Sequence, residues 1–296
     1  MRDSNLYLIP GIRLWQWRST AKAQSIVHDI SPEEVDWLLQ ELAGVDRLFL
    51  RLQPDQAIES TVSLSELDRR WQRRISDRMP IQYLAEIAPW RDFELKVAPG
   101  VLIPRPETEL LIDFALLQES SLRSGQWADL GTGSGAIAIG LARSLPDARI
   151  HAVDRSSEAL AIAKQNAERL NAKIQFYQGN WFEPIAHLSH SLSGIVSNPP
   201  YIPTKIVSEL QPEVRLHEPR LALDGGSDGL ESIRHLIQTA PDYLISGGVW
   251  MVEMMIGQAE TIAALLSAQG SYDRITIHQD LAGIDRFAIA YRKPKD

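Results

Sequence analysis

Residues 127–139 read WADLGTGSGAIAI and place a strand, a glycine-rich turn and a helix in direct succession. The apolar run Trp127–Leu130 is typical of a buried strand, and Ala136–Ile139 begins an apolar helix. Glycines let backbone N–H groups approach a ligand closely, and the helix N-terminus adds partial positive charge. In a doubly wound sheet such a turn lies at the carboxyl end of its strand, where ligands bind. We therefore predict a ligand-binding turn made of Gly131, Thr132, Gly133, Ser134 and Gly135.

An acidic residue ends the strand that is expected next, Arg149–Val153. Asp154 at that place can hydrogen-bond the two hydroxyls of a ribose. Gly131, Gly133 and Ala136 also satisfy the G-x-G-x-x-G/A fingerprint of dinucleotide-binding proteins. These residues predict a nucleotide-type ligand and leave an NAD-dependent dehydrogenase and a methyltransferase as open alternatives.

Strand patterns and helical patterns alternate from Glu107 onward. This alternation predicts an α/β domain with a mostly parallel, twisted, Rossmann-like sheet. The last two strands, near Ile275 and Phe287, are joined by a short turn at Gly283 and are expected to be antiparallel. The other expected strands are Trp127–Leu130, Arg149–Val153, Lys173–Tyr177, Gly194–Ser197 and Gly248–Met254.

The preceding part of the chain, from about residue 11 to residue 79, has helical patterns and no strand–helix alternation. One helix is expected between an N-cap at Ser31 and a C-cap at Gly44, and a second runs from about Ser65 to Arg78. The sequence therefore predicts a small helical bundle.

Five prolines between Pro80 and Pro106, with short alternating apolar runs, indicate a hairpin or extended linker. We therefore place a domain boundary in this stretch. The predicted organisation is a helical domain at residues 1–80, a linker at residues 81–106 and the α/β domain at residues 107–296.

The strand expected at Gly194–Ser197 ends in the tetrapeptide Asn198-Pro199-Pro200-Tyr201. Two successive prolines lack N–H donors and cannot continue a central strand, so the chain must turn out beside the glycine-rich turn. The Asn198 side-chain oxygen and the Pro199 carbonyl can accept the two hydrogens of a planar NH2 group, on which Tyr201 can pack flat. This arrangement suits methyl transfer to an amide or exocyclic amine nitrogen by positioning and electrostatics. A dehydrogenase would give the tetrapeptide no task.

The chain has a formal net charge of -8 and no cysteine. The acidic balance disfavours a protein that holds long stretches of nucleic acid backbone, and the lack of cysteine excludes disulfides, thiol nucleophiles and cysteine-ligated metals. No apolar run reaches the roughly 20 residues that cross a bilayer, and the histidines form no recognisable metal spacing. We expect a cytoplasmic protein without a metal, a membrane association or stable nucleic-acid binding.

With these features the chain resembles the class I S-adenosylmethionine-dependent methyltransferases, and more specifically the release-factor glutamine methyltransferases of the PrmC/HemK family. Val101–Glu109 (VLIPRPETE) resembles that family's interdomain signature. Glu218–Gly226 (EPRLALDGG) resembles the stretch after its catalytic strand, and Asp280 with Asp285-Arg286 resembles the end of its chain. The small helical N-terminal domain also fits, so the resemblance covers most of the sequence.

The resemblance implies methylation of the side-chain amide nitrogen (N5) of the glutamine in the Gly-Gly-Gln motif of class 1 peptide release factors. It implies S-adenosyl-L-methionine as the methyl donor and substrate recognition by residues 1–80. An amino-methyltransferase that acts on adenine or another exocyclic amine of nucleic acid, after flipping the base, is the alternative.

The resemblance also implies a role for individual residues. Gly131 to Gly135 would line the methionine part of the cofactor, Asp154 would hold its ribose, and Trp181 would pack near its adenine, with Asn198 also at the cofactor. All four residues of the tetrapeptide would bind the substrate. Asn198, Pro199 and Tyr201 would also be catalytic, whereas Pro200 would only contact the substrate.

Three positions depart from the family pattern. Asn180 stands where the family often has Asp, and Glu86 stands where its linker commonly has Gly. Glu253 begins a stretch whose spacing is altered, so it is left out of the expected site. Three residues within the interdomain signature are expected near the cofactor or substrate entrance and receive no chemical step: Arg105, Glu107 and Thr108.

One predicted helix carries a cluster of five arginines. We interpret it as a solvated helix face, and a docking surface for a protein partner is the sharper alternative. The five are Arg69, Arg70, Arg73, Arg74 and Arg78.

Overall fold

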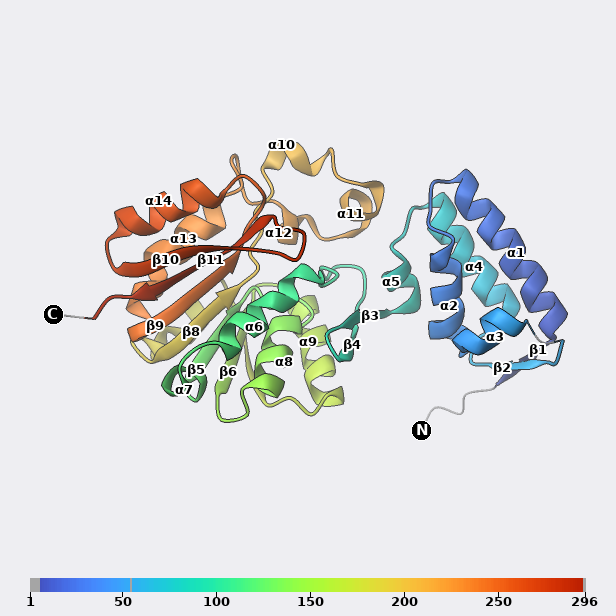
Figure 1. Cartoon of the computed structure of the whole chain (residues 1–296), viewed down its shortest axis with the longest axis horizontal. Helices are drawn as coiled ribbons and strands as arrows, with labels where there is room; N and C mark the ends of the chain where they lie inside the picture. The colour runs from blue at the N-terminus through green and yellow to red at the C-terminus, as the bar shows by residue number, and fades with distance from the viewer. Residues whose placement is uncertain (1–5, 54, 295–296) are drawn as a thin grey trace. The chain divides into compact units, whose positions relative to one another are not determined.

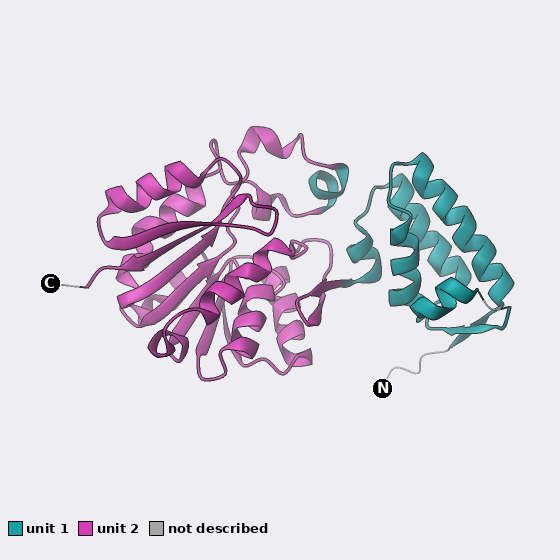
Figure 2. Cartoon of the chain, in the orientation of Figure 1, with its two compact units in different colours: residues 1–87, 212–217 teal, residues 88–211, 218–296 magenta. Residues whose placement is uncertain are grey.

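The computed structural model describes residues 6–53 and 55–294. The first five residues of the domain expected at 1–80 and the last two of the domain expected at 107–296 lie outside the described residues. The chain forms two compact units, which Figure 2 shows in different colours. Unit 1 comprises residues 1–87 and 212–217, and unit 2 comprises residues 88–211 and 218–296.

Unit 2 is built on a seven-stranded sheet with the order β10-β11-β9-β8-β5-β6-β7 (Figure 1). The five neighbouring strands β9, β8, β5, β6 and β7 are parallel. β11 pairs antiparallel with both β9 and β10. The predicted α/β fold and its antiparallel end are therefore confirmed. The strands are β5 (Gln126–Leu130), β6 (Arg149–Asp154), β7 (Ile174–Gln178), β8 (Leu192–Ser197), β9 (Leu244–Glu253), β10 (Tyr272–Gln279) and β11 (Asp285–Arg292).

The strand order determines where the sequence motifs meet. β5 lies between β6 and β8 and is parallel to both. The glycine-rich turn after β5, Asp154 at the end of β6 and the tetrapeptide after β8 therefore share one edge of the sheet. Ligands of doubly wound sheets bind at this edge.

Helices cover both faces of the sheet. On one face α6, α8 and α9 pack on a core that includes Trp127 and Phe287. On the other face η2, α13 and α14 pack on a core that includes Leu130 and Trp250. These helices are α6 (Leu110–Leu116), α8 (Ala136–Ser144), α9 (Ser157–Arg169), η2 (Glu183–Leu188), α13 (Glu231–Thr239) and α14 (Ala259–Gln269).

Shorter elements join this scaffold. The hairpin expected in the linker is present, because β3 and β4 pair with two residues between them. The buried Asn166 side chain on α9 accepts from the Lys96 backbone N–H and donates to the Ser134 carbonyl, so it ties this hairpin to the glycine-rich turn. The short elements are β3 (Ile87–Trp90), β4 (Phe93–Lys96), η1 (Glu107–Glu109), α7 (Ser120–Arg123), α10 (Thr204–Val207), α12 (Arg220–Leu223) and η3 (Ala240–Asp242).

Unit 1 is mainly helical, with Leu38, Leu39 and Trp71 fully buried in its core. It also contains a short antiparallel pair, β1 with β2, so the expectation of helices alone is wrong there. A strand of three residues is too short to produce a readable alternation. The elements are β1 (Tyr7–Ile9), α1 (Gly11–Val27), α2 (Glu33–Ala43), α3 (Arg47–Leu52), β2 (Ile58–Ser60), α4 (Leu64–Ser76), α5 (Ile81–Ala85) and α11 (Pro212–His217).

The helix ends follow from local chemistry. Gly44 ends α2 with a φ of +66°, as predicted, whereas the N-cap position falls at Pro32, one residue after the expected Ser31. The Ser31 hydroxyl still accepts from the Glu33 N–H at 3.3 Å. Glu86 ends α5 with a φ of +60°, a conformation that costs a residue with a side chain about 1 kcal/mol and that glycine adopts freely.

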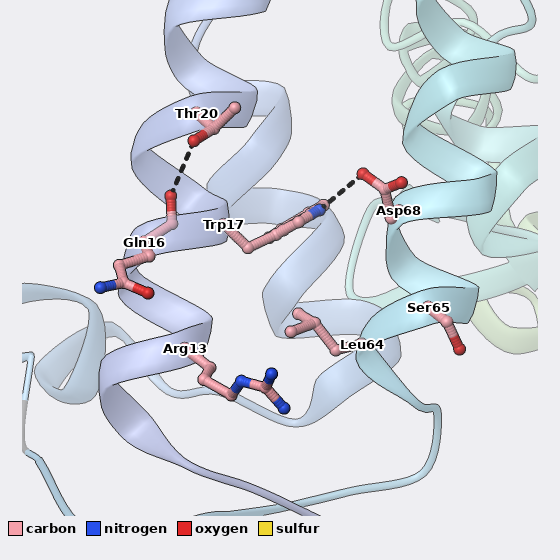
Figure 3. Close-up of a pocket in the computed structure, with 7 residues that line it drawn as sticks. All are labelled: Arg13, Gln16, Trp17, Thr20, Leu64, Ser65 and Asp68. Carbon is pink, nitrogen blue, oxygen red and sulfur yellow. Dashed lines mark hydrogen bonds between the residues drawn. The ribbon is translucent and has the colours of Figure 1, made fainter.

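Unit 1 carries a hollow of about 540 Å³ between α1 and α4 (Figure 3). There the Trp17 indole N–H donates to Asp68 Oδ1 at 3.0 Å. No residue of the predicted site lies in this hollow. None of the described helices is long and apolar enough to cross a membrane.

Candidate active site

The glycine-rich turn after β5 has a conformation that requires glycine. Gly131, Gly133 and Gly135 have φ values of +80°, +55° and +87°, a region in which a Cβ is strained. The backbone N–H groups of Gly131 and Thr132 both donate to the Val153 carbonyl, at 2.9 and 3.0 Å. The turn is therefore fixed against the end of β6.

Asp154 links this turn to the next one. Its carboxylate accepts the Gly133 N–H at 2.8 Å and the Ser156 N–H at 2.9 Å, one on each oxygen. Burial raises the pKa of Asp154. Each carboxylate oxygen has a further lone pair, so the group can still accept hydrogen bonds from ribose hydroxyls.

Asp129 lies fully buried beneath the turn and was not singled out in the sequence. Its Oδ2 accepts from the Thr132 hydroxyl at 2.5 Å and from the Ala138 N–H at 3.0 Å. Burial raises the pKa of Asp129 to about 7. Asp129 thus holds the turn to the first residues of α8 through its hydrogen bonds.

The Trp181 indole covers the glycine-rich turn from the loop after β7. A Cβ at position 131 would lie 3.5 Å from the Trp181 ring. Trp181 itself has a φ of +45°, and Asn180 before it is exposed at the same place. The position fits a flat group stacked on or beside the indole.

A cavity of about 370 Å³ opens at this edge of the sheet. A drug-sized ligand fits a cavity of this order of size. Five predicted site residues are not among those that line it: Thr132, Ser134, Gly135, Pro199 and Tyr201. The described residues contain no cluster of three or more groups suited to hold a metal ion. The predicted site residues that line the cavity are Gly131, Gly133, Asp154, Trp181, Asn198 and Pro200.

Side chains from two elements, Thr108 in η1 and Glu253 at the end of β9, hold the tetrapeptide after β8. The Asn198 Nδ2 donates to Thr108 Oγ1 at 3.1 Å, and the Thr108 hydroxyl donates to Glu253 Oε2 at 2.6 Å. The Tyr201 hydroxyl donates to the other carboxylate oxygen of Glu253 at 3.1 Å. Asn198 Oδ1 and the Pro199 carbonyl make no hydrogen bond with any residue that the structure describes.

Glu253, which was left out of the site expected from the sequence, belongs to it through these hydrogen bonds. It is 1% exposed, and burial raises its pKa to about 6. Burial, with the nearby Glu253 carboxylate, also raises the pKa of the Tyr201 hydroxyl. A signal was present in the sequence, because Glu253 is a carboxylate at the carboxyl end of the fully buried run Val249–Val252.

Comparison with known proteins decides between the open alternatives. The model of the PrmC N-terminal domain matches residues 16–85, and the model of the methyltransferase small domain matches residues 106–211. A release factor glutamine methyltransferase of Synechocystis sp. is 49% identical over 294 residues, which cover 97% of this chain and 98% of the relative. The release factor glutamine methyltransferase of Thermosynechococcus vestitus is 49% identical, and the match covers 94% of this chain and 97% of the relative. That of Geobacter sulfurreducens is 43% identical, and the match covers 86% of this chain and 87% of the relative.

The chain belongs to the release factor glutamine methyltransferase family. This membership confirms the resemblance drawn from Val101–Glu109 and from the tetrapeptide, and it excludes the dehydrogenase alternative.

In this family member, residues from two other segments of unit 2, around Leu223 and at Gln258, hydrogen-bond to the backbone at the end of the tetrapeptide. The Ile202 N–H donates to the Leu223 carbonyl at 3.0 Å, and the Gly225 N–H donates back to the Ile202 carbonyl at 2.9 Å. A Cβ at position 225 would lie 2.6 Å from the Pro200 carbonyl oxygen, so only glycine fits there. The Gln258 side chain also donates to the Tyr201 carbonyl at 3.0 Å. Backbone and side-chain hydrogen bonds thus fix the position of the tetrapeptide.

An ion pair joins the two stretches that resemble family signatures. The Arg105 guanidinium donates to Glu218 Oε1 at 2.6 Å, and Glu218 is 6% exposed. Burial raises the pKa of Glu218, and the Arg105 charge opposes that shift. The pair holds Val101–Glu109 against Glu218–Gly226 and thereby shapes two walls of the cavity, because both stretches contribute lining residues.

Proposed function

We propose that this chain methylates the side-chain amide nitrogen (N5) of the glutamine in the Gly-Gly-Gln motif of class 1 peptide chain release factors. The general activity, glutamine methylation of release factors, is that of the family to which the chain belongs. The observation that carries the residue assignment is the pair of acceptors at the end of β8. Asn198 Oδ1 and the Pro199 carbonyl are both without a partner among the described residues.

These two acceptors match the two hydrogens of a primary amide. Asn198 Oδ1 accepts one N–H hydrogen of the glutamine and the Pro199 carbonyl accepts the other. The Tyr201 ring packs against the amide plane, and Pro200 lines the cavity next to it. As the N–C bond forms, the bond between the methyl group and the donor sulfur would break with its electron pair staying on sulfur, and the nitrogen would then release one of its two hydrogens to solvent as a proton. Positive charge develops on the nitrogen before that proton leaves, so both hydrogen bonds strengthen in the transition state. The chain contributes positioning and electrostatics, without a covalent intermediate.

The cavity next to these acceptors suits S-adenosyl-L-methionine. When bound, this cofactor supplies an electrophilic methyl group on a sulfonium. Within the turn from Gly131 to Gly135, the lining residues Gly131 and Gly133 would face its methionine part. Asp154 would hold its ribose, and Trp181 would pack near its adenine. Asn180 can accept a hydrogen bond from an adenine amine. No step assigned to this chain needs a metal.

The larger organisation follows from the same proposal. Residues 1–80 would recognise the release factor, residues 81–106 would form the linker, and residues 107–296 would carry out methyl transfer. Because the partner is a protein, stable nucleic-acid binding and membrane association are not expected. Because a release factor acts in translation termination, we expect the enzyme in the cytoplasm.

The test uses radiolabelled S-adenosylmethionine and two purified release factors, one with the Gly-Gly-Gln loop and one with its Gln replaced by Ala. Label is expected in the first only. Asn198→Ala should lower kcat at least about 100-fold, because one transition-state hydrogen bond is lost, and should leave cofactor binding within about threefold. Gln56→Ala, which removes an exposed amide in unit 1, is the control and should behave as the parent.

Two outcomes would contradict the proposal. Label in neither release factor, together with label in DNA or RNA added in parallel, would favour a nucleic-acid amino-methyltransferase. Full activity of Asn198→Ala on the release factor would leave the substrate in place and overturn the role of Asn198.

A further inference from the structure

Four side chains from three elements form one hydrogen-bond relay in unit 2. It runs from Asn198 after β8 to Thr108 in η1 and on to Glu253 at the end of β9, where Tyr201 joins from the other side. Thr108 is 3% exposed and Glu253 is 1% exposed. The proposed function uses only the outer members, Asn198 and Tyr201, and assigns nothing to Thr108 or Glu253.

The chemistry of the relay fixes its direction. A carboxylate only accepts hydrogen bonds, so the single hydroxyl hydrogen of Thr108 must point to Glu253. Thr108 Oγ1 then has only lone pairs left for Asn198 and must accept. An acceptor at that place selects the NH2 branch of the Asn198 amide. The oxygen branch, Oδ1, is consequently the one left for a ligand.

The opposite orientation would defeat the proposed reaction. If the amide of Asn198 were rotated by half a turn, its NH2 group would meet the NH2 group of the substrate. Two donors would then face each other, and the substrate would lose one of its acceptors. Asparagine has no intrinsic preference between these orientations, so a neighbour has to impose one.

We propose that Thr108 and Glu253 are positioning residues that hold the Asn198 amide with its oxygen toward the substrate, while Glu253 also anchors the Tyr201 ring through its hydroxyl. The inference rests on the proposed role of Asn198 as the acceptor for the glutamine amide. Neither residue touches the reacting atoms in this scheme. Their effect on the rate passes through Asn198 and Tyr201.

The test compares two substitutions at one position. Thr108→Val keeps the shape of threonine and removes the hydroxyl, whereas Thr108→Ser keeps the hydroxyl. Thr108→Val should lower kcat about 10- to 100-fold, the effect of losing or misorienting one hydrogen bond, with KM and cofactor affinity within about threefold. Thr108→Ser should keep kcat within about threefold of the parent. Thr276→Val on β10, the same change at an exposed hydroxyl, is the control.

A second variant reaches the same relay from its other end. Glu253→Met removes the carboxylate with little change in volume and should lower kcat at least as much as Thr108→Val. Because both changes break one relay, the double variant Thr108→Val/Glu253→Met should be no slower than Glu253→Met alone. Independent effects would instead multiply.

Each outcome has a distinct meaning. If Thr108→Val folds and its kcat is unchanged, the inference is overturned. If only Glu253→Met folds, an unchanged kcat in that variant overturns it instead. In both cases the activity of the parent still supports the proposed function. A Thr108→Ser variant as slow as Thr108→Val overturns it too, since the methyl group and not the hydroxyl would then matter. A parent enzyme that does not label the Gly-Gly-Gln release factor overturns the proposed function itself.

Discussion

At the scale of single residues, the site depends on polar groups whose orientation is set by a partner. Asp154 is held by two backbone N–H groups, and Asn198 is held through Thr108 by the charge on Glu253. Such groups need no reorganisation when the ligand binds, which lowers the barrier to reaction. The cost is a buried carboxylate that is less easily ionised.

The ionisation of Glu253 predicts an acid limit on activity. Burial raises its pKa from 4.5 to about 6, so lowering the pH through 6 protonates the carboxylate in the folded enzyme. A protonated Glu253 can donate to Thr108, the relay loses its fixed direction, and Asn198 is no longer oriented. We expect kcat to fall about tenfold per pH unit below this pKa, measured with saturating release factor between pH 5 and pH 8.

The other charged groups around Glu253 are Glu107, whose charge raises its pKa, and Arg286, whose charge lowers it, with the neutral Tyr201 hydroxyl bonded directly. The control is Thr108→Val, whose relay is already broken. Its low kcat should change less with pH near 6 than that of the parent, because only the contact of Glu253 with Tyr201 is left to respond. A parent profile that is flat from pH 5 to pH 8 would contradict the assignment.

At the scale of elements, the helix α11 belongs with the helical unit although it lies far along the chain. Arg74 on α4, which is 5% exposed, donates to Glu34 on α2 and to Glu213 on α11, and Arg78 also pairs with Glu213. The interpretation of the arginine cluster as a solvated face is therefore wrong for Arg74. Arg69 pairs with Glu66 on its own helix and is exposed, as that interpretation expects. Arg70 also pairs with Glu66, but it is partly buried and donates to the Leu84 carbonyl on α5.

Removing Glu213 should release α11. Glu213→Ala leaves the buried Arg74 with one of its two carboxylates, which we expect to lower the free energy of unfolding of unit 1 by about 2 kcal/mol. Hydrogen exchange at residues 212–217 should accelerate at least about tenfold. Glu209→Ala, an exposed carboxylate four residues earlier, is the matched control and should leave exchange unchanged. Equal exchange in the two variants would argue against the anchoring role of Glu213.

These elements also indicate what the sequence could reveal. The inner strands of unit 2 were predictable because each contains a buried apolar run bounded by glycine, proline or a polar residue, which are local signals. The edge strands β7 and β10 are only partly buried. The pairing of β1 with β2 and the position of α11 could not be predicted, because each depends on residues that are distant in the sequence. Arg74, for example, contacts Glu213, which lies 139 positions later. The residues of the predicted site could be identified because they lie at or just after the carboxyl ends of strands. The same position brings them together at one edge of the sheet. Thr108 was expected near the site without a role, and Glu253 was left out because the spacing of its stretch departs from the family pattern. Their roles depend on hydrogen bonds between η1, β9 and the tetrapeptide, which join separate parts of the chain.

At the scale of the whole molecule, the methyltransferase unit buries titratable groups whose pKa values move in opposite directions. Burial raises the pKa of Asp129 from 3.8 to about 7 and that of Glu253 to about 6. The folded state therefore holds protons that the unfolded chain releases, so these two groups favour folding increasingly as the pH falls from 7 to 5. Burial lowers the pKa of His151 from 6.5 to about 4, so this group acts in the opposite direction below pH 6.5.

Between pH 8 and pH 5, the stability gained from Asp129 and Glu253 exceeds the stability lost from His151. At about 1.36 kcal/mol for each pKa unit within this pH range, unit 2 should be more stable at pH 5 than at pH 8 by about 2 kcal/mol. Urea denaturation at the two pH values measures this difference. In Asp129→Asn the new amide oxygen still accepts from Thr132 and Ala138, while the main proton-binding group is gone, and the advantage at pH 5 should disappear. A parent that is less stable at pH 5 would mean that Asp129 ionises normally. If the expectation holds, stability and kcat change in opposite directions below pH 6, because the protonation that relieves the buried Glu253 also removes the orientation of Asn198.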